Sequence, residues 1–177
     1  MNYIKISKTD IANGTGVRVV LWVAGCDMHC RGCHNHESWD FNAGQPFTDE
    51  TMQEIIDALN HPWIQGLKLS CGHPLAYNNL PEVYQICKDV KERLPEKDIW
   101  LYTGYTLDVN DFDNSVDIGW DNALLRNHIL AKCDVVVDGA YIDELRDISL
   151  KFRGSSNQRL IDVKRTIESQ TIVVKED

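Results

Sequence analysis

Short apolar runs alternate with amphipathic stretches along this chain. The run at residues 18–23 is rich in β-branched residues, and similar short runs occur at residues 67–70, 99–102 and 135–138. Runs of this length and composition are typical of buried strands, so we expect four strands at these positions. Each run ends in a loop that carries glycine or polar residues.

Apolar residues at helical spacing predict three helices between these strands. The first begins after Thr48 or Thr51, either of which can cap a helix. The second begins near Leu80 with Pro81 in its first turn, and the third covers residues 123–131. The apolar faces of the first two helices are Met52, Ile55, Ile56 and Leu59, and Val83, Ile86, Cys87, Val90 and Leu94.

The alternation of strand, loop and helix is typical of right-handed βαβ units with a mostly parallel sheet. Ligands of such α/β proteins bind where the carboxyl ends of the strands meet. We therefore expect an α/β fold in one domain, residues 1–177, with its functional groups at that edge of the sheet. Residues 151–177 are less periodic, and residues 171–174 are predicted there as an edge strand.

Composition and charge narrow the class of protein. Hydrophobic residues make up 43% of the chain and charged residues 25%, which is ordinary for a globular protein. The formal net charge of -9 argues against nucleic acid as a partner. No apolar run is long enough for a membrane span, and the N-terminal residues lack the features of a secretory signal. We expect a cytoplasmic protein with no membrane partner.

Aspartates gather near the third predicted helix. The spacing does not match a calcium loop, which needs a central glycine and a terminal glutamate. A solvated loop is therefore the prediction for this segment. Its aspartates are Asp108, Asp111, Asp113, Asp117 and Asp121.

Three cysteines follow the first predicted strand. Cys26, Cys30 and Cys33 form a Cys-x3-Cys-x2-Cys run, a spacing that indicates metal binding in a reducing compartment rather than disulfides. Three thiolates on one loop can hold three irons of a 4Fe-4S cluster, and the fourth iron is then open to a substrate or cofactor. An open iron indicates chemistry rather than electron storage alone.

The cysteine run and its surroundings resemble those of radical S-adenosylmethionine enzymes, and in particular the activating proteins of anaerobic ribonucleotide reductase. The resemblance extends over nearly the whole chain. Besides the cysteines, it is carried by Gly25, Gly32 and Asn35, and by residues 13–16, 38–39, 98–105, 138–139 and 153–160.

This resemblance implies an incomplete (βα) barrel of the radical S-adenosylmethionine type with a mostly parallel sheet. Cys26, Cys30 and Cys33 would hold a 4Fe-4S cluster whose open iron binds S-adenosyl-L-methionine. Reductive cleavage of that cofactor would give a 5'-deoxyadenosyl radical, which removes a hydrogen atom from a glycine of the partner. The implied partners are the large glycyl-radical subunit of anaerobic ribonucleoside-triphosphate reductase and a reduced flavodoxin or similar electron donor.

Contacts to the cofactor are expected from the ends of all four predicted strands. A loop-capping role is at least as well suited to Asp138 as a contact with the cofactor. The six residues expected at the cofactor are Gly32, Cys33 and His34 on the cysteine loop, and Gly72, Thr103 and Asp138 after the later strands.

The loop after the second predicted strand departs from the family, whose members usually have two glycines, an acidic residue and a proline. This chain has Cys71, Gly72, His73 and Pro74. The role of the acidic side chain is lost, and Cys71 needs a shifted backbone if its position requires a positive φ. Cys71 either fills the space of a glycine or competes as a fourth thiolate for the open iron. His73 is expected to be a loop residue rather than a base.

A binding module is the alternative to an enzyme. The cysteine loop is also compatible with a structural zinc site that takes His29, His34 or His36 as its fourth ligand, although zinc usually prefers two separated ligand pairs. In this alternative the protein is an adaptor without catalysis that binds either zinc or a cluster. Whether the segment from Arg153 to Arg159 contacts a cofactor, a partner or the protein's own core also stays open.

Overall fold

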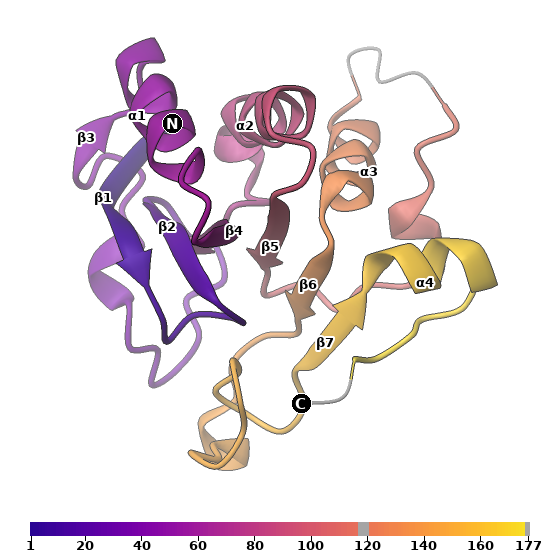
Figure 1. Cartoon of the computed structure of the whole chain (residues 1–177). Helices are drawn as coiled ribbons and strands as arrows, with labels where there is room; N and C mark the ends of the chain where they lie inside the picture. Colours follow the sequence, from indigo (N-terminus) through magenta and orange to yellow (C-terminus); the bar gives the residue numbers. More distant parts are fainter. Residues whose placement is uncertain (117–120, 176–177) are drawn as a thin grey trace.

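The computed structural model describes residues 1–116 and 121–175, and in these residues seven strands form one open mixed sheet in the order β3-β1-β2-β4-β5-β6-β7 (Figure 1). Four neighbouring strands are parallel: β2 (Val17–Val23), β4 (Ile64–Cys71), β5 (Asp98–Tyr102) and β6 (Val135–Asp138). The antiparallel strands are β1 (Asn2–Asp10), β3 (Gln45–Pro46) and β7 (Arg159–Asp162).

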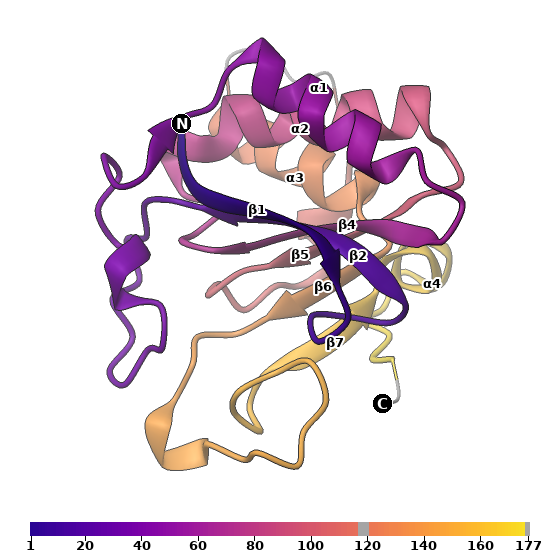
Figure 2. The same cartoon turned by 60° about the vertical axis from the view of Figure 1, so that its left-hand side comes forward.

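Helices α1, α2 and α3 lie over one face of this sheet (Figure 2). The described helices are α1 (Asp49–Leu59), α2 (Leu80–Arg93), α3 (Asn122–Lys132) and α4 (Val163–Ser169). Short 3-10 turns cover His36–Ser38, Tyr77–Asn79, Val109–Phe112 and Asp143–Leu145. None of the described helices combines the length and the apolar character that crossing a membrane requires.

The four predicted strands and three predicted helices are confirmed. Thr48 caps α1 through a reciprocal pair of hydrogen bonds with Thr51, and Asn60 ends the helix. Residues 171–174, predicted as an edge strand, do not form a strand: Val174 makes an isolated bridge with Ile161, and two backbone hydrogen bonds flank it, from Asp162 to Val173 and from Lys175 to Leu160. Strand β7 occupies that edge of the sheet instead.

Strand β1 was not predicted, and its side chains explain why. Among its nine residues only Tyr3 is buried, and the pairing with β2 is interrupted by two shifts of register. A strand that buries so little carries neither a continuous apolar run nor a clean alternation. The sequence signal at this edge was therefore weak.

The expected solvated loop of aspartates is in part a set of helix caps. Asp108 caps a 3-10 turn that buries Phe112, and Asp121 caps the start of α3. Capping by aspartate satisfies backbone N–H groups that lack a partner inside the helix. Asp117 lies outside the described residues.

The two faces of the sheet differ in chemistry because successive side chains of a strand point to opposite faces. The face under the helices is aliphatic, and Leu67, Leu69 and Leu101 are fully buried there. The opposite face carries cations over aromatic rings. Arg18 lies 4.7 Å from the ring centroid of Trp100, and Lys68 lies 3.9 Å from that of Tyr102.

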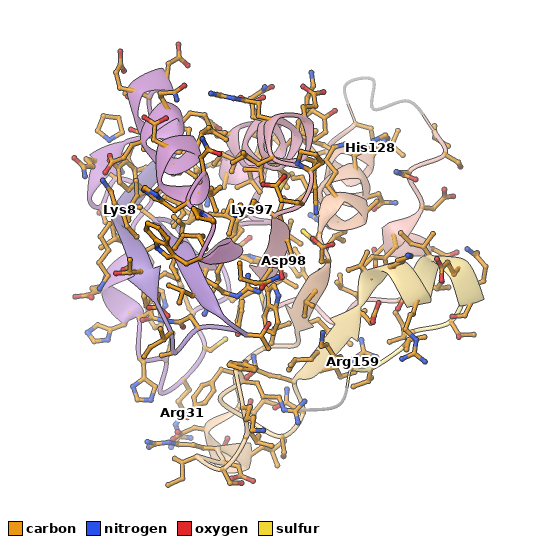
Figure 3. The ribbon with its side chains drawn as sticks, in the orientation of Figure 1. Lys8, Arg31, Lys97, Asp98, His128 and Arg159 are labelled. Carbon is orange, nitrogen blue, oxygen red and sulfur yellow. The ribbon has the colours of Figure 1, made fainter. Side chains whose placement is uncertain are left out.

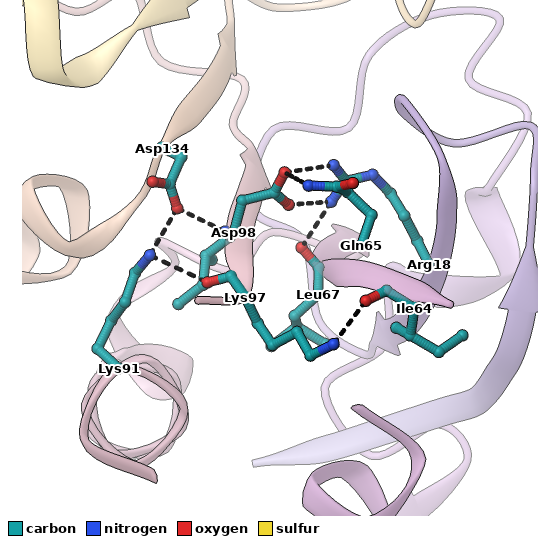
Figure 4. Close-up of polar contacts among 9 residues, drawn as sticks. Arg18, Ile64, Gln65, Leu67, Lys91, Lys97, Asp98 and Asp134 are labelled. Atoms are coloured by element: carbon teal, nitrogen blue, oxygen red, sulfur yellow. Dashed lines mark hydrogen bonds and ion pairs between the residues drawn. The ribbon is translucent and has the colours of Figure 1, made fainter. Parts of the chain in front are cut away.

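A bidentate ion pair joins β2 to β5 across β4 near the amino ends of these strands (Figure 4). The Arg18 Nη1 and Nη2 atoms lie 2.6 and 2.9 Å from the two carboxylate oxygens of Asp98. Arg18 is fully buried, and Gln65 also donates to Asp98 at 3.4 Å. Paired geometry of this kind offsets the cost of burying the guanidinium.

Two glycines leave room for this ion pair. A Cβ atom on Gly66 would lie 2.2 Å from the Asp98 Oδ1 atom, and one on Gly14 would lie 2.5 Å from the Arg18 Nε atom. Gly14 also has a φ of +135°, which side chains rarely adopt. The ion pair therefore depends on glycine at both positions.

Two lysines form hydrogen bonds and an ion pair at the same end of the sheet (Figure 4). The buried Lys97 donates to the carbonyl oxygens of Ile64 and His61 at 2.7 and 3.1 Å. Lys91 of α2 lies 2.7 Å from Asp134 Oδ2, which also accepts the N–H of Ile99 at 2.7 Å. Charged groups thus close the amino edge of the sheet, and the carboxyl edge is left for the site.

Replacement of Asp98 by asparagine should destabilise the fold, because Arg18 would keep a buried charge without its counter-ion. We expect the free energy of unfolding to fall by about 3 kcal/mol. Urea unfolding of the metal-free Asp98→Asn variant, followed by circular dichroism, measures this. The exposed Asp57→Asn variant is the control and should change stability by less than about 0.5 kcal/mol. Equal losses in both variants would contradict a stabilising role for the ion pair.

Candidate iron-sulfur site

The carboxyl ends of the four parallel strands meet at one edge of the sheet, toward which the arrowheads of β5 and β6 point in Figure 1. The cysteine loop follows β2, the loop with Gly72 and His73 follows β4, and Thr103 follows β5. The long loop between β6 and β7 begins at Gly139. Parallel pairing therefore brings together the segments expected to carry the site.

The cysteine loop is anchored at its start. The N–H groups of Gly25 and Cys26 donate to the carbonyl oxygens of Ser38 and Trp39 at 2.8 and 3.0 Å. Gly25 has a φ of +86°, and a Cβ atom there would lie 2.1 Å from the ring of Phe41. Only glycine fits this position, so the loop leaves the strand along a defined path.

Backbone hydrogen bonds join the cysteine loop to the loop after β4. The N–H of Gly72 donates to the carbonyl oxygen of Val23 at 2.8 Å, and the N–H of His73 donates to that of Gly25 at 2.6 Å. A Cβ atom on Gly72 would lie 2.6 Å from the carbonyl oxygen of Gly25. Glycine at position 72 therefore permits the close approach of the two loops.

A cavity of about 150 Å³ lies between these loops. The three predicted metal ligands are half-buried at its wall. Lining residues from three different strand ends are Cys26, Cys30, Cys33, Cys71, Gly72 and Thr103. The structure thus brings all three cysteines of the motif to one cavity.

The donor set of this cavity fits an iron-sulfur cluster, because soft thiolates are the ligands that such clusters take. The Cys33 sulfur accepts the N–H of Asn35 at 3.4 Å, a bond of the kind that tunes cluster potential. Among the described residues, no three His, Cys, Asp or Glu side chains converge to hold a single metal ion. Burial raises the pKa of the Cys26 thiol, and metal binding would remove its proton.

Cys71 occupies a backbone position that suits glycine. Its φ is +77°. A residue with a Cβ atom is strained in this left-handed conformation, which is the cost that we expected if the position required a positive φ. Burial raises the pKa of its thiol, with Ser38 and Cys33 among the neighbouring groups. The side chain lines the same cavity as the three motif cysteines, and both roles considered for it therefore remain predictions.

His73 is a buried loop residue that links two strand ends. Its Nδ1 atom lies 2.6 Å from Asp27 Oδ1, and its Nε2 atom lies 2.9 Å from the hydroxyl of Thr103. The Thr103 hydroxyl also accepts the N–H of Tyr105 at 3.1 Å. The side chain of Asn79 donates to the carbonyl oxygen of His73 at 3.0 Å. These bonds fix both the ring and the backbone of this residue.

The hydrogen bonds decide where the proton of His73 lies. Burial lowers the pKa of His73, although Asp27 opposes this, so the ring is neutral near pH 7. Burial raises the pKa of Asp27, but the hydrogen bond from His73 opposes it and the net shift is downward. The ionised Asp27 can only accept, so Nδ1 carries the proton and Nε2 accepts from Thr103.

Asp138 is fully buried and forms an ion pair with the partly exposed Arg159 of β7, which Figure 3 labels. Its Oδ1 atom accepts from Arg159 Nε at 3.0 Å, and its Oδ2 atom accepts from Arg159 Nη2 and from the N–H of Leu107. The bond to Leu107 is a loop-capping role, in which Asp138 accepts from the loop after β5. A contact with a cofactor remains a prediction for Asp138.

The other expected cofactor residues lie at this edge of the sheet. Gly72 and Thr103 line the cavity that the three motif cysteines border, called the cluster cavity below. Cys33 lines both this cavity and a second, adjoining cavity. His34 lines the second cavity, and a Cβ atom on Gly32 would lie 2.9 Å from the side chain of Asp143. Their contacts with a cofactor likewise remain predictions.

The segment from Arg153 to Arg159 packs against the chain itself. Gln158 accepts the N–H of Gly154 at 2.9 Å and donates to the carbonyl oxygen of Gly139 at 3.0 Å. Asn157 donates to the carbonyl oxygen of Ala140 at 2.8 Å. The segment therefore shapes the loop after β6, and Gln158 also lines the cluster cavity.

The loop between β6 and β7 lies opposite the cysteine loop, where Figure 3 labels Arg31. Arg31 forms an exposed ion pair with Glu144 at 3.4 Å. Tyr141 of the same loop lines both cavities. This loop thus forms the wall of the site that faces the cysteines.

Sequence reasoning missed four residues of the site. Asp27, Lys68, Ser70 and Tyr141 carried no motif that marked them. Lys68 and Ser70 alternate with Leu67 and Leu69, a pattern that could have placed them on the face opposite the core. No such signal existed for Asp27, whose partner His73 is 46 residues away.

Comparison with known proteins agrees with this site. The family of the 4Fe-4S single cluster domain matches residues 12–161, a range that includes all three motif cysteines. This match favours an iron-sulfur cluster over the zinc alternative.

Curated relatives cover most of the chain. An anaerobic ribonucleoside-triphosphate reductase-activating protein of Pasteurella multocida is 41% identical over 160 residues, which are 89% of this chain and 95% of the relative. Proteins of the same name from Escherichia coli and from Enterobacteria phage T4 are 39% and 41% identical and cover 89% and 90% of this chain. The matches span 96% and 93% of those two relatives. The chain, which matches the 4Fe-4S single cluster domain, therefore belongs to the family of anaerobic ribonucleoside-triphosphate reductase-activating proteins.

Proposed function

We propose that this protein is a radical S-adenosylmethionine activase that installs a glycyl radical on an anaerobic ribonucleoside-triphosphate reductase. Its electron donor would be a reduced flavodoxin or a similar protein. The observation that carries the proposal is the set of three cysteines on one loop, Cys26, Cys30 and Cys33, which line a cavity at the carboxyl edge of the sheet. The family membership supports the same function.

The fold supports an incomplete barrel of the radical S-adenosylmethionine type, formed by residues 1–177 as one domain. Four parallel strands with helices on one face support this proposal, because such a barrel would be built from βα repeats. The free state of all six cysteines supports a reducing, cytoplasmic location.

The cluster and S-adenosyl-L-methionine would together supply an electron and a 5'-deoxyadenosyl radical for hydrogen abstraction. Cys26, Cys30 and Cys33 would hold the cluster, and the Asn35 N–H would donate to the Cys33 sulfur. Gly72 and Thr103 border the space where the cofactor would lie.

His73 would position the loop that binds the cofactor. Asp27 holds its ring from the cysteine loop and Thr103 holds it from the end of β5. The neutral ring brings no positive charge to the edge of the cavity. In this chain the histidine and Asp27 together provide a carboxylate beside the loop, where the family usually has an acidic residue.

Anaerobic cleavage of S-adenosyl-L-methionine tests the proposed function. The protein is reconstituted with iron and sulfide, reduced, and incubated with the cofactor, and 5'-deoxyadenosine is quantified by chromatography. We expect equal amounts of iron and sulfide, and product well above that of the Cys30→Ala variant, which lacks one cluster ligand. Addition of the reductase should then give the electron paramagnetic resonance signal of a glycyl radical.

Two outcomes would contradict this proposal. Bound zinc without visible absorption would support a zinc-binding adaptor. A loaded cluster that gives no 5'-deoxyadenosine even with the reductase present would support a cluster-binding adaptor, for which the changes at Cys71 and His73 would be the reason.

Substitutions of Cys71 should separate backbone strain from metal binding. The Cys71→Gly variant should be about 1 kcal/mol more stable than Cys71→Ala, because alanine keeps a Cβ atom at a φ of +77°. Urea unfolding of the metal-free, reduced proteins measures the difference. Both variants should bind as much iron as the unchanged protein, since the three motif cysteines suffice.

The buried Cys87 on α2 provides the control for loss of a thiol. Cys87→Ala should lower stability by leaving a cavity and should leave iron content unchanged. A lower iron content in both Cys71 variants, but not in Cys87→Ala, would identify Cys71 as a cluster ligand instead.

A further inference from the structure

A second cavity, of about 540 Å³, adjoins the cluster cavity on the face of the sheet opposite helices α1, α2 and α3. The residues that line both cavities are Cys33, Asn35, Ser70, Tyr102, Tyr141 and Gln158. Other residues line the second cavity but not the cluster cavity, among them Lys68 of β4, Asn13 and Phe152. A ligand in this cavity would therefore lie directly beside the cluster site.

Lys68 lies at the wall of this cavity with only 3% of its surface exposed. Its Nζ atom lies 2.6 Å from the side-chain oxygen of Asn13 and 3.9 Å from the ring centroid of Tyr102. In the described part of the chain, no carboxylate forms an ion pair with this lysine. An ammonium group has three donors, and here one oxygen accepts.

The other buried lysine shows what a satisfied environment looks like. Lys97, with 6% exposed, donates to two backbone carbonyl oxygens, of Ile64 and His61, and also lies 4.0 Å from Glu96. Buried charges in proteins are normally paired or fully hydrogen-bonded. Lys68 departs from this rule at a cavity wall, where a ligand could supply the missing acceptors.

The surroundings of Lys68 favour an anion. Arg146 and Arg153 line the same cavity, although the chain as a whole has a net charge of -9. Asp147 also lines it, but its Oδ1 atom accepts the N–H and the hydroxyl of Ser149 at 2.8 and 2.6 Å. Three basic side chains thus border one cavity in an acidic protein.

The pKa of Lys68 points the same way. Burial lowers the pKa of Lys68 to about 7, and the charge of Asp10 only partly opposes this. A bound oxyanion would restore the charged form by pairing with it.

We propose that Lys68 binds the oxyanion of a ligand, a carboxylate or a phosphate group, in the cavity that adjoins the cluster site. Two of its N–H donors would bond to oxyanion oxygens, while the third keeps its bond to Asn13. Arg146 and Arg153 would add attraction at the mouth of the cavity. This inference does not depend on the radical chemistry proposed above, because anion binding can be measured without turnover.

Binding of simple anions by the reconstituted full-length protein tests this inference. Sodium phosphate and sodium glutarate are titrated separately at constant ionic strength, with glycerol as the uncharged probe, and affinity is measured by calorimetry. We expect one of the two anions to bind at least tenfold more weakly to Lys68→Met, and glycerol not to bind. The anion that binds shows whether the natural ligand offers phosphate or carboxylate.

Lys132→Met is the matched control. Lys132 also lies over an aromatic ring, 5.7 Å from the centroid of Tyr84, but on helix α3 and away from the cavity. Its replacement removes a cation of the same kind and should leave anion affinity unchanged. Equal weakening by both lysine variants would mean that net charge alone attracts the anion, and it would overturn the inference.

Thermal unfolding separates binding from a structural role of Lys68. The anion that binds should raise the melting temperature of the unchanged protein and of Lys132→Met, but not that of Lys68→Met. Lys68→Gln, which can still hydrogen-bond to Asn13, should lose this stabilisation equally. An anion effect that persists in Lys68→Gln, or no effect of either anion on the unchanged protein, would overturn the inference.

Discussion

Parallel pairing of β2, β4, β5 and β6 is the constraint on which the rest of this structure depends. It gathers four strand ends at one edge, so that residues far apart in sequence line one cavity. The hydrogen bonds from Gly72 to Val23 and from His73 to Gly25 then hold two of the following loops together. The three cysteines face a cavity because the strands that surround them run in the same direction.

Sequence patterns predicted the parallel core and the cysteine site, because both depend on local signals. Apolar runs and helical spacing located four strands and three helices, and the spacing of Cys26, Cys30 and Cys33 indicated the cluster. Contacts between distant residues left no such signal. The pairs Asp27 with His73 and Asp138 with Arg159 arise only when strand ends meet, and β1 buries too little to show a pattern.

The face of the sheet opposite the helices combines cations with aromatic rings, which distinguishes it from an ordinary apolar core. Arg18 is paired with Asp98 near the amino end, whereas Lys68, nearer the site, has no carboxylate partner among the described residues. Structural and ligand-binding roles thus separate along one face. A buried charge that the protein satisfies supports the fold, and one that it leaves unsatisfied favours a ligand.

The ion pair of Arg18 with Asp98 and the cavity of the cysteines lie at opposite ends of the same strands. The ion pair of Arg18 with Asp98 therefore supports the fold away from the end where chemistry is expected. Substitutions at the reactive end, such as cysteine and histidine at positions 71 and 73, can accumulate without loss of the framework that carries them. The arrangement makes the reactive edge evolvable: new specificities can be explored there while the chain still folds.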